Sequence, residues 1–98
     1  MTRPLFSIGT GFRGPFLSLR APLAPEGEPG WRRRDLLAAV HYAAAEVLIA
    51  MPEGADWSVD VDTTLRHGAA HVWVRPFGDN ADAHALLRRL WPDALEAP

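Results

Sequence analysis

The sequence feature that most constrains this fold is a long helical segment whose surface is apolar on nearly every side. Within residues 32–51, leucine, valine and methionine recur at helical spacing and predict one helix with a buried stripe. The opposite side of this helix has Glu46 as its only charged residue. A helix that is apolar on both sides is normally covered on both sides, yet a chain of 98 residues offers little material for a second layer.

This outer face of the helix predicts self-association. Pairing with a second copy about a two-fold axis would bury this face, because the same patch of each subunit then contacts the other. The alternative within one chain is that the N-terminal segment, through residues 12–16 or Trp31, folds over the face. We expect a homodimer. The expected self-association face consists of Ala38, Tyr42, Ala45 and Ile49.

Two pairs of extended segments flank this helix. Apolar and polar side chains alternate in residues 17–23, and residues 5–8 are a shorter candidate strand. The glycine-rich residues 9–14 are expected to close a hairpin between the two segments. A segment rich in proline and glycine, residues 22–30, predicts a surface loop that leads into the helix.

The second hairpin is predicted from residues 57–65 and 70–77, with a turn at 67–68 or a four-residue loop at 66–69. Either loop places Asp60 opposite Arg75 as a cross-strand ion pair. It also directs Val61 and Val74 toward the core. A slip by one residue would break the alternation of both strands, so we expect this register.

A second helix is predicted for residues 81–91, because alanine and leucine again form one stripe and Pro92 follows. Residues 92–98 are expected to fray. The element order β-β-α-β-β-α predicts a single small α+β domain, residues 1–98, in which two helices pack on one face of an antiparallel sheet.

The glycine spacing in residues 9–14 fits the dinucleotide-binding pattern G-x-G-x-x-G, but its context does not. That pattern needs its last glycine to open a helix, whereas Pro15 and a strand follow here. We interpret the match as a chance feature of a turn. Backbone N–H groups in such a turn are able to hold an anion, with Arg13 beside it.

The basic residues are unevenly distributed. All ten are arginine, which together with frequent alanine is typical of a bacterium with a GC-rich genome. Residues 1–34 have a net charge of +4 and residues 35–98 a net charge of −6. If the arginines bind an anion or a nucleic acid, we expect them to share one exposed surface. The candidate contacts are Arg13, Arg32, Arg33 and Arg34.

No residue is assigned to catalysis, to a cofactor or to a metal. The chain has no cysteine, and none of its serines lies in a G-x-S-x-G elbow. Asp60, Asp62 and His71 fall on one face of the second hairpin, but their spacing is not diagnostic of a metal site. A small metal-dependent enzyme is therefore the least favoured of three functional hypotheses.

The favoured hypothesis is a small cytosolic domain that acts by self-association or protein–protein interaction. The alternative is an accessory protein that binds anions or nucleic acid through arginine. Residues 1–9 lack the apolar run of a secretory signal, and the chain lacks an uncharged stretch of membrane-spanning length. We therefore expect a cytoplasmic location without membrane contact.

Overall fold

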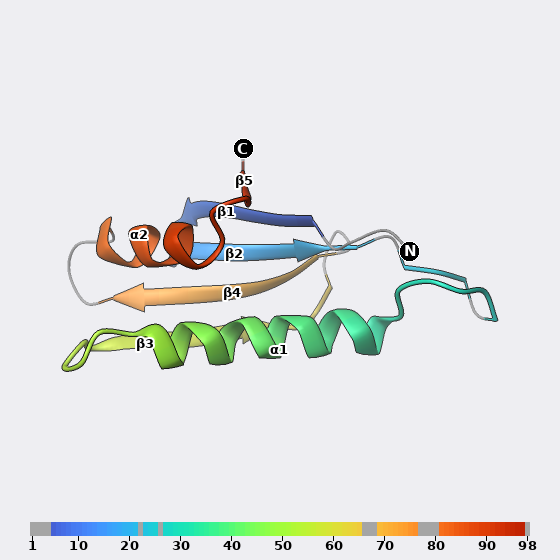
Figure 1. Cartoon of the computed structure of the whole chain (residues 1–98), viewed down its shortest axis with the longest axis horizontal. Coiled ribbons are helices and arrows are strands. Elements are labelled where there is room, and N and C mark those ends of the chain that lie inside the picture. The colour runs from blue at the N-terminus through green and yellow to red at the C-terminus, as the bar shows by residue number, and fades with distance from the viewer. Residues whose placement is uncertain (1–4, 22, 26, 66–68, 77–80, 98) are drawn as a thin grey trace.

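The computed structural model describes residues 5–21, 23–25, 27–65, 69–76 and 81–97. In this part of the chain the elements follow the order β-β-α-β-β-α-β (Figure 1). The predicted α+β class is confirmed, and a short strand is added after the second helix. The elements are β1 (Leu5–Gly11), β2 (Gly14–Arg20), α1 (Arg33–Ala50), β3 (Trp57–Asp62), β4 (Ala69–Pro76), α2 (Ala81–Leu90) and β5 (Leu95–Glu96).

The described strands form one sheet in the order β3-β4-β2-β1-β5. All neighbours are antiparallel except β1 and β5, which are parallel. The two hairpins join through β2 and β4, where Leu17 lies opposite Val72. Both helices contact this sheet on the same face, as predicted, and no helix formed by the described residues lies over its other face (Figure 1).

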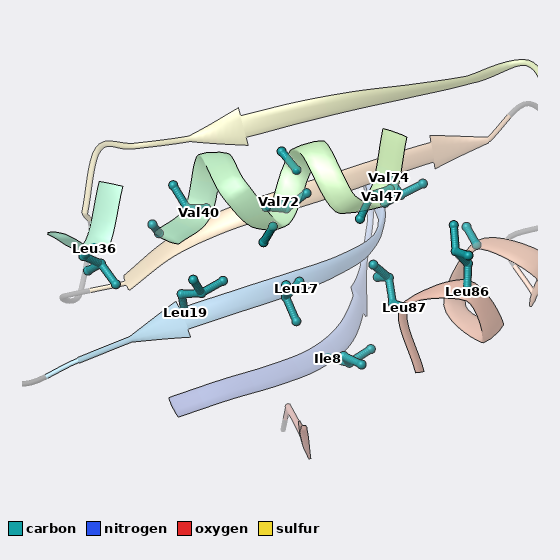
Figure 2. Close-up of a cluster of buried hydrophobic side chains, with 14 of the residues drawn as sticks. Ile8, Leu17, Leu19, Leu36, Val40, Val47, Val72, Val74, Leu86 and Leu87 are labelled. Carbon is teal, nitrogen blue, oxygen red and sulfur yellow. The ribbon is translucent and has the colours of Figure 1, made fainter. Parts of the chain in front are cut away.

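The apolar core lies between the helices and the sheet (Figure 2). Its position follows from the alternation of the strands and the buried stripes of the helices. Leu48 departs from the sequence prediction, because helical spacing places it in the stripe of α1 and its side chain is 57% exposed. The largest fully buried side chains are Ile8, Leu17, Leu19, Leu36, Val40, Val47, Val72, Val74, Leu87 and Pro15.

The β1–β2 hairpin is tighter than predicted. Gly9–Gly11 extends β1 and Gly14 begins β2, so the turn consists of Phe12 and Arg13 alone. Gly14 has a φ of +112°, which L side chains rarely adopt. A Cβ atom at Gly14 would also lie 2.8 Å from the carbonyl oxygen of Val74 in β4. The hairpin therefore depends on glycine at this position.

The predicted register of the β3–β4 hairpin is wrong by two residues. Asp60 pairs with Trp73 rather than with Arg75, and Asp62 pairs with His71. A two-residue shift preserves the period of the strand, so Val61 still packs against the core as predicted. Arg75 and Asp60 remain within reach as diagonal neighbours, with Nη1 and Oδ2 separated by 3.5 Å.

The physical reason for the shift is the way in which β3 ends. Oδ1 of Asp62 accepts hydrogen bonds from the backbone N–H of Thr64 at 3.0 Å and from its hydroxyl at 2.8 Å. This local turn stops the strand at Asp62, and Leu65 then adopts a positive φ of 57°. The connection thus begins earlier than predicted, and most of the predicted turn at residues 66–69 lies outside the described residues.

The C-terminal segment pairs with the sheet where fraying was predicted. Leu95 lies opposite Ser7 of β1, and the backbone N–H of Ala97 donates a 2.8 Å hydrogen bond to the carbonyl of Ile8. Arg88 of α2 holds this segment, because its guanidinium donates to the carbonyl of Ala94 at 2.5 Å and pairs with the carboxylate of Glu96. The free edge of β1 is therefore partly paired.

Candidate functional site

One uncovered surface is the outer face of α1. The side chains of Tyr42 and Ile49 are 70% and 85% exposed, and that of Leu48, which precedes Ile49, is 57% exposed. The small residues Ala38 and Ala45 are also exposed. The residues Ala38, Tyr42, Ala45, Leu48 and Ile49 are called the α1 strip below.

The described part of the chain does not fold over the α1 strip, which removes the alternative weighed above. Phe16 lies on the sheet face that points away from the helices, because it pairs with Trp73 and not with a core residue. Phe12 is 97% exposed at the β1–β2 turn. Trp31 lies before α1, where it forms a bridge with Leu23.

A hollow of about 290 Å³ lies directly beside the α1 strip. Tyr42, Ala39 and Glu46 line it from α1, while Phe6 and Trp91 close its other side. The rings of Phe6 and Trp91 stack with a centroid distance of 6.3 Å, and they also border a second hollow of about 390 Å³ near the C-terminal end of α2. The apolar surface thus continues from the helix into a depression.

Arg32, one of the predicted anion contacts, holds the loop before α1. Its guanidinium donates hydrogen bonds to the carbonyl of Pro25 at 2.7 Å, to that of Ala24 at 3.3 Å and to that of Glu28. Its backbone N–H donates to a carboxylate oxygen of Asp35 at 2.8 Å, which ties the start of the helix. Most N–H donors of the Arg32 guanidinium are therefore used to hold this loop.

The four candidate arginines do not form one surface. Arg33 and Arg34 are exposed in the first turn of α1. Arg13 lies in the β1–β2 turn, and Figure 1 shows the start of α1 and the junction of β1 with β2 at opposite ends of the sheet. The structure thus separates Arg13 from the helical arginines.

Arg13 instead lies beside an aromatic cluster that the sequence analysis missed. Phe16 of β2 and Trp73 of β4 have ring centroids 4.7 Å apart, and the ring of His71 lies 5.9 Å from that of Trp73. The guanidinium carbon of Arg13 lies 5.9 Å from the Trp73 ring centroid. Phe16, His71 and Trp73 are called the aromatic platform below.

Charged groups border the aromatic platform. Burial lowers the pKa of the His71 imidazole, with Arg20 acting in the same direction and Asp62 opposing it, so His71 is neutral at pH 7. Hydrogen bonds from the Thr64 backbone and hydroxyl lower the pKa of Asp62, which stays ionised. Among the described residues, no three His, Cys, Asp or Glu side chains are grouped to hold a metal ion.

No protein-family model, curated protein or solved structure matches this chain. Neither helix, within the described residues, is long and apolar enough to cross a membrane. Two surfaces of the described residues are candidate binding sites, the α1 strip on the helical side and the aromatic platform on the open face of the sheet.

Proposed function

We propose that this chain is a small, non-catalytic binding domain of the bacterial cytoplasm that works as a homodimer through the α1 strip. The observation that carries the proposal is the exposure of Tyr42, Leu48 and Ile49 on one helical face, at 70%, 57% and 85%. Large apolar side chains gathered on one face are typical of an interface. Glu46 is partly buried at the edge of this face, so the strip itself has no charge to solvate it.

A second copy is the occupant that fits the order of residues along the helix. If two α1 helices pack antiparallel about Ala45, Tyr42 of each protomer meets Leu48 and Ile49 of the other, because these positions lie three or four residues on either side of Ala45. The methyl group of Ala45 permits close approach of the helix axes at the centre. Tyr42 buries its ring and keeps its hydroxyl at the rim.

The available area also favours a contact wider than one helix. From Ala38 to Ile49 the helix is about 18 Å long and about 10 Å wide, which gives roughly 180 Å² for the strip alone. A stable interface takes about 600 Å² or more from each partner. The hollow bordered by Phe6 and Trp91 adjoins the strip and adds apolar surface on the same side.

Sedimentation velocity at micromolar concentration tests the proposal. We expect the wild-type chain to sediment with twice its monomer mass of 10.8 kDa, and to shift toward monomer on dilution. A species that remains at 10.8 kDa at all concentrations would reject the dimer.

A further inference from the structure

The rings of Phe16 and Trp73 lean over the sheet toward β1, tilted 48° to each other, and two glycines of β1 make room for them. A Cβ atom at Gly9 would lie 2.7 Å from the ring of Phe16, and one at Gly11 would lie 3.2 Å from the ring of Trp73. Each ring therefore reaches across from its own strand onto bare backbone. The G-x-G spacing of residues 9–11, interpreted above as a chance match to the dinucleotide pattern, makes room for these rings.

Among the described residues of this face, two arginines at its ends and the carboxylate of Asp62 lack an ion-pair partner. Asp60 is paired with Arg75, and the Asp62 carboxylate accepts hydrogen bonds from Thr64. Arg13 and Arg20 form no ion pair with any described residue and are exposed at the start and end of β2. The strand between them spans about 20 Å. The platform thus has cations at both ends, although the whole chain has a net charge of −2.

A further aromatic ring extends the platform at the hairpin turn. The guanidinium of Arg13 lies 5.8 Å from the ring centroid of Phe12 as well as near Trp73, so it stands between the two rings. The Phe12 ring is 97% exposed. A planar ligand has access to Phe12 without any change in the fold.

From this arrangement we propose that the open face of the sheet binds single-stranded nucleic acid. Aromatic rings exposed on a sheet stack with unpaired bases of any sequence, and cations beside them contact the phosphates. A duplex keeps its bases stacked inside, where the aromatic rings cannot reach them. An acidic peptide would use the arginines but would leave the aromatic rings without a planar partner.

This binding site does not depend on the proposed dimer. The platform lies on the sheet face opposite the helices, whereas the α1 strip lies on the outer side of a helix. A dimer formed through α1 therefore leaves the platform of each protomer exposed. Loss of the dimer and loss of nucleic-acid binding are separately measurable.

Fluorescence anisotropy of a labelled oligothymidylate of about eight nucleotides, titrated with the full chain, tests the proposal. We expect Trp73→Ala to weaken binding about tenfold or more, because one stacking ring is lost. Two phosphate contacts predict that the logarithm of the binding constant falls with the logarithm of salt with a slope of about −1.4. Arg13→Ala, at an exposed turn position where the fold is not at risk, is expected to halve that slope.

Matched controls are available on the helical side. Tyr42→Ala removes an exposed aromatic ring from the α1 strip, and Ile49→Asp removes the proposed dimer contact. Both are expected to leave the affinity per site unchanged. Circular dichroism establishes that Trp73→Ala is folded before its affinity is compared.

The proposal is overturned if the oligonucleotide binds no better than heparin or a duplex of the same length. It is equally overturned if folded Trp73→Ala and Arg13→Ala bind like the wild type. Binding of an acidic peptide but not of the oligonucleotide would identify the face as a protein-docking surface instead.

Discussion

Replacing Ile49 by aspartate is expected to raise the dissociation constant of the dimer by at least about a thousandfold. Ile49 is 85% exposed in the protomer, so the substitution leaves the core intact. In the proposed dimer each subunit would bury one such carboxylate against apolar side chains. Each unpaired carboxylate weakens the free energy of dimerisation by about 2 kcal/mol or more. Sedimentation velocity should show monomers at concentrations where the wild type is a dimer.

Phe12→Asp is the matched control for this experiment, because Phe12 is at least as exposed but lies at the β1–β2 turn. It should leave the dimer unchanged. If both substitutions weaken association equally, the added negative charge weakens it, and not the loss of a contact in the α1 strip. If neither weakens it, the contact lies elsewhere.

Replacing Gly14 by alanine is expected to lower the free energy of unfolding by about 3 kcal/mol or more. The φ of +112° is strained for any residue with a Cβ atom, at a cost of about 1–3 kcal/mol. The added methyl group would also lie 2.8 Å from the carbonyl oxygen of Val74, which is backbone and cannot rotate away. Urea denaturation in the Ile49→Asp background measures the effect without a contribution from dimerisation.

Gly54→Ala separates the two causes. Gly54 also has a positive φ, of 81°, but no atom lies within 4 Å of the added Cβ position. Its substitution is expected to cost only about 1 kcal/mol. An equal or larger loss of stability in Gly54→Ala would mean that the contact between Gly14 and β4 is not needed.

The faces of the elements were predictable from the sequence because they follow from local periodicity. Alternation in residues 57–62 placed Val61 toward the core, and helical spacing placed Tyr42 and Ile49 on the outside. The register was not predictable in the same way, because a shift of two residues leaves every side chain on its face. The hydrogen bonds that Thr64 donates to Asp62 end β3 early, and the periodicity of the sequence does not predict them.

The aromatic platform was missed because it depends on contacts between distant segments. Phe16 and Trp73 become neighbours only when β2 pairs with β4, whereas alternation and turn signals predict pairing only within each hairpin. The role of Arg32 was missed for a related reason, since three arginines in succession suggest a charged surface and do not reveal which one binds loop carbonyls. The one available signal was the pair Gly9 and Gly11, opposite the aromatic residue of the next strand.

Disulfide cross-linking tests the central claim, an antiparallel contact of two α1 helices, most directly. The chain has no cysteine, so a single Ala45→Cys substitution places one thiol per protomer near the proposed axis, where two Cα atoms approach within the roughly 4.4–6.8 Å that a disulfide requires. Ser58→Cys, on the exposed sheet face away from the helices, is the control. The account predicts that mild oxidation converts most of Ala45→Cys, and little of Ser58→Cys, into a covalent dimer of twice 10.8 kDa. Equal cross-linking of the two variants, or no cross-linking of Ala45→Cys, would contradict it.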